Sequence, residues 1–241
     1  VLNQDIDKIR RTLEETSHKD FYEAVDAIVS ARKIYILAAR SASALGIFLN
    51  YYFSLIFDKV ELVTTTSKTE IYEKMFRINE EDVFIGISFP RYSKQAVSAM
   101  NFAKRKGARG IALTDSLLSP LAQQADFVLL ARSDMASVVD SLVAPLSLIN
   151  AMIVATALKK KDEVSKTFQT WKRFGMSTRF MKRLRRIRLK LEFDVAVVGG
   201  GPAGMMAAAS AAKLGARTVL LERTRSWAEA DDNRQRPVQC L

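Results

Sequence analysis

Short apolar runs alternate with helical periodicity along the first two thirds of the chain. The runs are rich in Ile, Val, Leu and Phe and lack a strict polar–apolar alternation, which is typical of strands covered on both faces. Five strands are predicted, at residues 33–38, 60–63, 82–88, 109–114 and 126–131. Because helical segments separate them, the pattern indicates an α/β fold with a doubly wound, five-stranded parallel sheet.

Helical patterns fill the intervals between these strands. Helices are predicted at 42–57, 67–76, 94–106 and 118–124, and a long apolar helix at 137–158. Residues 2–30 also have amphipathic periodicity, which places Ile6, Ile9 and Leu13 on the apolar side of the first helix. Both ends are therefore expected to pack as helices around the sheet, in a first domain that spans residues 1–176.

The residue inventory excludes several classes of chemistry. The chain has one Cys, Cys240, and one His, His18, so a disulfide framework, a Cys/His zinc site and a His-centred catalytic triad are excluded, and no metal is expected. The longest apolar stretches, 42–57 and 142–158, are interrupted by polar residues and are shorter than a spanning helix requires. No secretion signal is recognisable at the start. We expect a cytoplasmic protein without membrane contact.

The positive charge is concentrated in one segment. The formal net charge is +11, and residues 159–191 carry 13 basic against two acidic residues, which leaves 24 of each sign elsewhere. The basic excess is thus a property of this one segment and not of a folded face within residues 1–158. We interpret residues 177–192 as a basic linker, and a contact with RNA, DNA or an acidic membrane stays open as the alternative.

Hydroxyl-bearing residues follow three of the predicted strands. In an open parallel sheet the ligand crevice lies beyond the carboxyl ends of the strands. Hydroxyl groups, helix-start amides and an arginine fork at that edge suit a phosphoryl group. N-capping of helices is the alternative role for each serine. The candidate residues are Ser41, Ser43, Ser88, Arg91, Ser93, Thr114 and Asp115.

Two segments carry a family resemblance. The runs VFIGISFPRYS at 83–93 and GARGIALTDSLLSPLA at 107–122 resemble the sugar isomerase (SIS) domain of RpiR-type transcriptional regulators, over residues 1–175. The resemblance implies a flavodoxin-like sheet, a homodimer or tetramer, and a sugar-phosphate or amino-sugar-phosphate effector held by Ser41, Ser43, Ser88 and Ser93. Many family members have a glycine-rich first loop, whereas Ala38, Ala39 and Arg40 stand here.

A sensor is favoured over an enzyme. Aldose–ketose isomerisation needs a general base beside the sugar and an acid for ring opening, but His18 precedes the sheet and no carboxylate follows Ser93 closely. We therefore predict binding without catalysis; a sugar-phosphate isomerase is the alternative. RpiR-type regulators bind DNA through an N-terminal helix-turn-helix domain, and no candidate for one precedes the sheet in this chain.

A second, smaller unit follows the basic segment. A strand at 193–198 leads into Gly199, Gly201 and Gly204, a helix at 205–214 and a strand at 217–221 that ends before Glu222. This order is the dinucleotide-binding fingerprint, with the acid placed for a ribose hydroxyl. The motif resembles FAD-binding flavoproteins of the aminoacetone-oxidase-like family. One partial Rossmann βαβ unit at 193–222 cannot enclose FAD, so no bound cofactor is expected; a fragment of an FAD-dependent oxidoreductase is the alternative.

The last residues do not continue this pattern. Codons that can encode residues 227–241 can also encode, in the reading frame shifted by one nucleotide, an amino-acid sequence that resembles the next motif of the same flavoproteins. We therefore interpret residues 223–241 as a frameshifted, unstructured tail.

Overall fold

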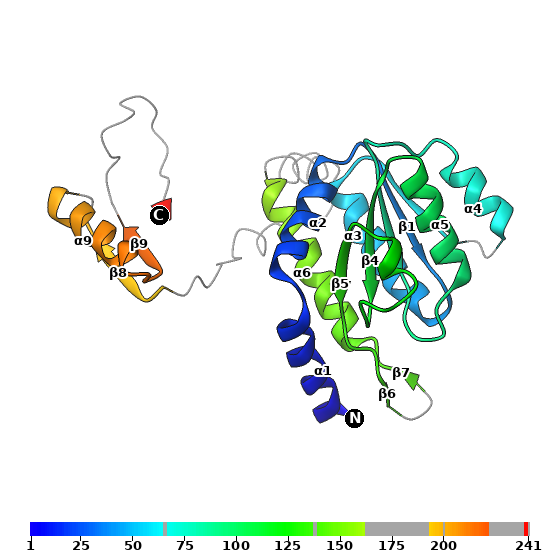
Figure 1. Ribbon diagram of the computed structural model, residues 1–241, viewed down its shortest axis with the longest axis horizontal. Helices are drawn as coiled ribbons and strands as arrows, with labels where there is room; N and C mark the ends of the chain where they lie inside the picture. The colour runs from blue at the N-terminus through cyan, green and yellow to red at the C-terminus, as the bar shows by residue number, and fades with distance from the viewer. Residues whose placement is uncertain (65–66, 137–138, 162–192, 200, 222–238, 241) are drawn as a thin grey trace, which may run out of the picture. The chain divides into compact units, whose positions relative to one another are not determined.

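The computed structural model describes residues 1–64, 67–136, 139–161, 193–199, 201–221 and 239–240 (Figure 1). The chain divides into two units, 1–181 and 182–241, and each is described by itself. The predicted basic linker at 177–192 and the end of the predicted first domain lie outside the described residues, so these boundaries stay predictions.

A five-stranded parallel sheet forms the centre of the first unit (Figure 1). Its order is β2-β1-β3-β4-β5, and all four pairings are parallel. This confirms the doubly wound α/β fold and all five predicted strands. The bounds are β1 Ile34–Ala38, β2 Val60–Val63, β3 Val83–Ile87, β4 Arg109–Thr114 and β5 Phe127–Leu130.

Helices cover both faces of this sheet, which explains its apolar strands. One core cluster joins the sheet to α2 (His18–Ser30), α3 (Ser43–Ile56) and α6 (Val143–Lys159). A second cluster on the other face joins it to α4 (Lys68–Met75) and α5 (Lys94–Arg105). Alternate β1 residues supply the two clusters, Ile34 and Ile36 to the first and Tyr35 and Leu37 to the second.

Two predicted helices are shorter than expected. Within 118–124 only the 3-10 turn η2 (Ala122–Gln124) forms, because Pro120 interrupts the segment and the Ser116 and Ser119 side chains bond backbone amides in turns. The helix predicted at 137–158 begins at Val143 instead. Before it, β6 (Met135–Ala136) and β7 (Val139–Asp140) pair antiparallel.

The first helix, α1 (Leu2–Glu15), presents the opposite face from the one expected. Lys8 and Thr12 are buried, whereas Leu2, Ile6 and Leu13 are 80%, 54% and 68% exposed, and Ile9 is also exposed. The prediction that the apolar side faces the core is therefore wrong. The polar side is held instead, because the Thr12 and Thr16 hydroxyls bond backbone groups of Arg132 and Leu130 at the end of β5.

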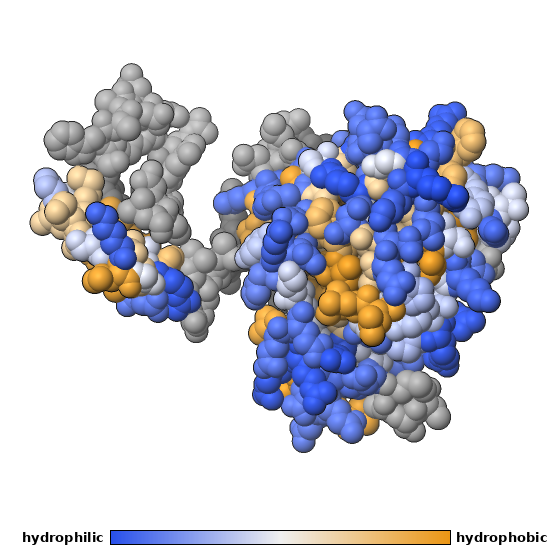
Figure 2. Space-filling model, viewed as in Figure 1, coloured by the Kyte–Doolittle hydropathy of each residue, from blue (hydrophilic) through white to orange (hydrophobic). Residues whose placement is uncertain are grey.

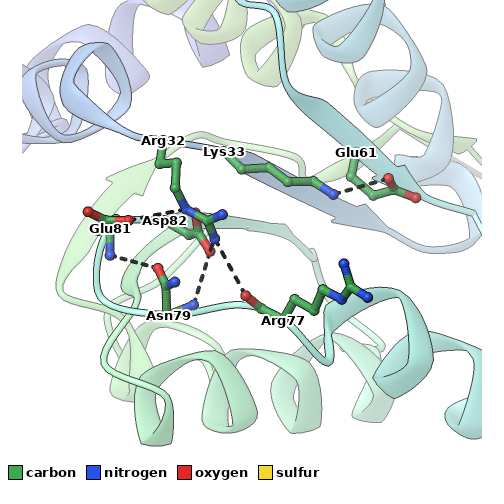
Figure 3. A network of polar contacts seen from close by, with 7 residues as sticks. All are labelled: Arg32, Lys33, Glu61, Arg77, Asn79, Glu81 and Asp82. Atoms are coloured by element: carbon green, nitrogen blue, oxygen red, sulfur yellow. Dashed lines mark hydrogen bonds and ion pairs between the residues drawn. The ribbon is translucent and has the colours of Figure 1, made fainter.

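A buried carboxylate fastens the amino ends of the strands (Figure 3). Asp82 is fully buried, and its Oδ2 accepts hydrogen bonds from the Arg32 guanidinium at 2.7 Å and from the Asn79 backbone N–H at 3.0 Å. Arg32 precedes β1 and Asp82 precedes β3, so the pair connects two neighbouring strands at the edge opposite to their carboxyl ends. Burial of a carboxylate is tolerated here because it is paired.

The second unit contains the predicted βαβ arrangement. Strand β8 (Val195–Val198), helix α9 (Pro202–Lys213) and strand β9 (Thr218–Leu221) follow in order, and β8 pairs parallel with β9. Arg217 donates from both its side chain and its backbone N–H to Asp194, which lowers the pKa of that carboxyl to about 2.

Part of the predicted unstructured tail is a strand. Gln239–Cys240 form β10, which pairs antiparallel with β9, so the expectation does not hold at these two residues. The remainder of the tail, residues 223–238 and 241, lies outside the described part, as does Glu222.

Candidate functional site

The strand order creates a switch point between β1 and β3. The chain leaves β1 toward β2 on one side and later places β3 on the other side. At such a point the two following loops diverge and open a crevice at the carboxyl ends of the strands. Two of the predicted hydroxyl clusters, Ser41 with Ser43 and Ser88 with Ser93, follow these two strands. The sheet thus brings them to one edge.

Both loops contain an arginine in a left-handed backbone conformation. Arg40, after β1, has φ 59°, and Arg91, after β3, has φ 67°. Residues other than glycine adopt such angles rarely, and strain of this kind concentrates at functional sites. The first loop forms the 3-10 turn η1 (Arg40–Ala42) directly before α3. The backbone therefore turns sharply at both sides of the switch point.

Asp140 joins these loops, although the sequence analysis did not select it. Its carboxylate accepts a hydrogen bond from the Ser41 hydroxyl at 2.9 Å and two from the Arg91 guanidinium, at 2.9 and 3.2 Å. The Asp140 side chain is 14% exposed and that of Arg91 is 64% exposed. The residue was missed because 137–158 was interpreted as one helix. Asp140 and Ser141 ahead of Pro145 are a helix-start signal that could have placed the boundary.

Ser88 and Ser93 are buried and act as capping groups. The Ser88 hydroxyl oxygen accepts from the Ser93 backbone N–H at 3.0 Å. The Ser93 hydroxyl oxygen accepts from the Ala96 N–H at 3.3 Å and caps the start of α5. These contacts fix the loop 88–93. They show the capping role that was the alternative for each serine, and they leave the role in ligand binding as a proposal.

Thr114 and Asp115 belong to a hydrogen-bonded group with Tyr92, which is separate from the contacts of Ser41 and Arg91 with Asp140. The Tyr92 hydroxyl donates to the Asp115 carboxylate at 2.9 Å, and the Thr114 hydroxyl bonds the same oxygen at 3.3 Å. Burial, followed by the hydrogen bond to Asp115, raises the pKa of Tyr92 to about 12. The contact links the loops after β3 and β4. Ser43, in contrast, is exposed at the start of α3.

A titration of Tyr92 should show this pairing. The difference in phenolate absorbance between the protein and its Tyr92→Phe variant should have a midpoint near pH 12, against 10.0 for an ordinary tyrosine. Because the folded pKa is raised, the stabilisation from this group is complete below about pH 10 and is lost as pH rises toward 12. Asp115→Asn should lower the midpoint. A midpoint of 10 in the parent protein would contradict the contact.

The glycines of the second unit have the geometry of their motif. Gly199 has φ 105°, and a Cβ at Gly204 would lie 1.9 Å from the Gly199 carbonyl oxygen. Gly199 is therefore required by the tight turn and Gly204 by the close packing of α9 against that turn, which are the roles of the first and third glycines of the motif. Gly201 caps that helix. These residues fit the diphosphate part of a dinucleotide, whereas Glu222, the predicted ribose ligand, lies outside the described residues.

Two features are absent from the described ranges. In them, no helix is both long and apolar enough to cross a membrane. The same residues contain no group of three His, Cys, Asp or Glu side chains arranged to hold a metal ion.

The fold and the site together define the class of the first unit. It is a flavodoxin-like, doubly wound α/β domain with hydroxyl groups and an arginine at the switch point of its sheet. The chain belongs to the SIS domain family, whose model matches residues 27–155. A second model, that of FAD dependent oxidoreductases, matches residues 194–227.

Individual relatives agree with this assignment. The chain is 26% identical over 170 residues to an uncharacterized HTH-type transcriptional regulator of Caldanaerobacter subterraneus. The aligned region covers 68% of this chain and 59% of the relative. The sugar isomerase domain of an RpiR transcription factor from Sphaerobacter thermophilus is 25% identical, with a TM-score of 0.68 over 72% of this chain and 96% of that one. The predicted resemblance to RpiR-type SIS domains is thereby confirmed.

A further solved structure has the same fold. The NanR protein of Vibrio vulnificus, complexed with ManNAc-6P, is 18% identical, with a TM-score of 0.60 over 70% of this chain and 66% of that one.

Proposed function

We propose that the first unit is the sugar-phosphate-sensing domain of an RpiR-type regulator, without catalytic activity, that acts in the cytoplasm. The observation that carries the proposal is the juxtaposition of Ser41 and Arg91 at the β1/β3 switch point, where both bond Asp140. A phosphoryl group would bind the Arg91 guanidinium, the Ser41 hydroxyl and amides of loop 88–93. The ManNAc-6P complex of the structurally similar NanR protein supports this ligand class.

Specific residues of the crevice have proposed roles. Arg91 and Ser41 would bind the phosphoryl oxygens, and Ser43, at the exposed start of α3, would extend the same subsite. Ser88 and Ser93 would shape loop 88–93 and present its amides. Thr114 and Asp115, which the hydrogen bond to Tyr92 holds in place, would lie beside the sugar. DNA binding would reside in a helix-turn-helix domain of the whole regulator.

The test is a thermal-shift panel on the full chain with hexose, pentose and N-acetylamino-sugar phosphates and inorganic phosphate. At about 100 times its Kd, a ligand of the native state stabilises it by about 2.7 kcal/mol, which raises Tm by roughly 5–10 °C. Ser88→Ala/Ser93→Ala should abolish the ligand-induced shift. Ser17→Ala, which removes the N-cap of α2, should lower the basal Tm and retain the shift.

The outcomes separate the sensor from its alternatives. A shift with none of these compounds would reduce the domain to an assembly module and contradict the proposal. Conversion of a bound sugar phosphate to its isomer, followed by NMR, would favour the isomerase. Asp140 gives that alternative a carboxylate at the site, but Ser41 and Arg91 already bond both of its oxygens.

We also propose that the unit forms a homodimer through the exposed sides of α1 and α3, which both pack on α6. Leu2, Ile6, Ile9 and Leu13 form one apolar stripe with the spacing of a coiled-coil seam. In Figure 2 the side of α1 turned to the viewer is mainly hydrophilic, and small apolar areas show at its borders. On α3, Ile47 and Tyr51 are also exposed, and both helices contact α6. Apolar patches of this kind mark interfaces.

Charge introduced on the stripe should dissociate the dimer. Light scattering of the eluted protein should give twice the chain mass of 27.0 kDa, and the Ile6→Glu/Leu13→Glu variant should give the single mass. Leu118→Glu, at an exposed apolar residue outside both helices, is the matched control and should remain dimeric. A monomeric parent protein would refute the interface.

For the second unit we propose no role in sensing. The absence of bound FAD stays a prediction, which flavin absorbance in the purified protein would contradict. The frameshift interpretation is checked by the coding DNA.

A further inference from the structure

The Arg91–Asp140 ion pair places a carboxylate where a phosphoryl group is expected. Asp140 takes two hydrogen bonds from Arg91 and one from Ser41, and these are two of the donors assigned above to the ligand. An anionic ligand and Asp140 would compete for the same groups, because like charges cannot share them without repulsion. The Asp140 carboxylate therefore resembles the ligand in charge and in its contacts.

The residue next to Asp140 bonds the first helix. The Ser141 hydroxyl donates to the Asp5 carboxylate of α1 at 2.7 Å, and Asp5 in turn lies 3.6 Å from the Lys8 ammonium. Lys8 is nine-tenths buried, and its ammonium has no hydrogen-bond partner in the described part of the chain. Asp5 is thus the neutralising contact that the structure provides for a buried cation. Its position matters because an unpaired buried charge is costly.

The two ends of α1 are attached differently. Toward its C-terminus, Thr12, Glu15 and Thr16 all bond Leu130 or Arg132 at the end of β5. Among the described residues, the Ser141–Asp5 bond is the side-chain hydrogen bond that attaches the first two turns to the rest of the unit. A displacement of residues 140–141 would therefore act on the N-terminal half of α1, which carries Leu2 and Ile6, while its C-terminal half stays anchored.

We propose that Asp140 is a competing internal anion, which ligand binding displaces from Arg91, and that Ser141 and Asp5 transmit this displacement to α1. The proposal rests on the proposed function, since it requires a phosphoryl group at Arg91. Asp140 and Ser141 are consecutive residues at the end of β7, so a displacement of the Asp140 backbone moves Ser141 with it. The site and the apolar stripe of α1 thereby become two ends of one contact chain, as coupling between distinct sites requires.

The test is a titration of the ¹⁵N-labelled full chain with inorganic phosphate, with sodium chloride at matched ionic strength as the reference. The amide resonances of loop 88–93 report phosphate binding, and those of residues 2–8 report the response of α1. Asp140→Asn should lower the Kd for phosphate about tenfold, because it removes a like charge from the site. It should also shift the 2–8 resonances, without phosphate, toward their phosphate-bound positions.

Two further variants separate transmission from binding. Ser141→Ala should bind phosphate with a Kd within about twofold of the parent protein, while the 2–8 resonances no longer respond. Asp7→Asn, which changes an exposed α1 carboxylate paired with Arg10 on its own helix, should preserve both the binding and the response.

Each contrary result has one meaning. An unchanged or higher Kd for Asp140→Asn would overturn the competition, and unresponsive 2–8 resonances in the saturated parent protein would overturn the transmission. Absence of a saturable phosphate response at 88–93 in both the parent and Asp140→Asn would refute the proposed function itself, and with it this inference.

Discussion

Replacement of Arg91 by alanine should weaken binding of the sugar phosphate by about 30-fold. Charge-assisted hydrogen bonds contribute about 1.5–3 kcal/mol each in favourable geometry, and a loss of about 2 kcal/mol corresponds to this factor. We take the lower part of the range because the Arg91 side chain is 64% exposed. Isothermal titration calorimetry with the strongest ligand of the thermal-shift panel measures the effect.

Three variants distinguish the guanidinium from the backbone conformation. Arg91→Gly relieves the positive φ of 67° and should lose affinity as Arg91→Ala does. Arg91→Lys keeps the charge without the planar fork and should recover part of the affinity. Arg105→Ala, at the far end of α5, removes the same charge elsewhere and should change Kd less than twofold. An unaltered Kd for Arg91→Ala would exclude this residue from the site.

The second large effect concerns folding. Asp82→Ala should lower the free energy of unfolding by about 2–3 kcal/mol, because the loss of a buried acceptor leaves the Asn79 N–H without its partner. Asp82 is fully buried, whereas its partner Arg32 is 38% exposed and can turn to solvent. Asp82→Asn keeps the shape and one acceptor and should cost less. Urea unfolding followed by circular dichroism, at constant m-value, measures both.

An exposed carboxylate provides the comparison. Asp7→Ala interrupts an ion pair whose two side chains are 65% and 63% exposed and should change stability by less than about 0.5 kcal/mol. Equal losses for Asp82→Ala and Asp7→Ala would contradict the importance of burial. The Asp82 network lies at the amino ends of the strands, so its variants should alter stability without altering ligand affinity at the opposite edge.

The positions of the strands were predictable because their signal is local. The strands of the sheet are short, mainly apolar runs in which Ile, Val, Leu and Phe are frequent, and β1 and β3 are buried on both faces. The glycines of the second unit were equally clear, since Gly204 is required by a clash within five residues of the chain. The positions of Ser41, Ser88 and Arg91 at one sheet edge followed from the same argument, because the loops after parallel strands meet there.

The face of α1 and the position of Asp140 could not be derived in this way. Ile6 and Leu13 repeat as a core stripe would, and the periodicity of a helix does not tell whether its apolar side meets its own sheet or another surface. In this fold the polar side is fixed by hydrogen bonds of Thr12 and Thr16 to Arg132 and Leu130 at the end of β5. Hydrogen bonds across more than 100 residues decide the orientation, and no local pattern contains them.

The sequence by itself thus determined the sheet, the two units and the hydroxyl-rich edge, since each follows from residues close together in the chain. The tertiary structure alone decided what these residues contact. It placed Asp140 against Ser41 and Arg91, which are 99 and 49 positions away, and it assigned Ser88 and Ser93 to backbone amides. The physical reason is that hydrogen-bond partners are selected by proximity in the folded chain, whereas hydrophobic periodicity indicates only which positions along an element favour burial.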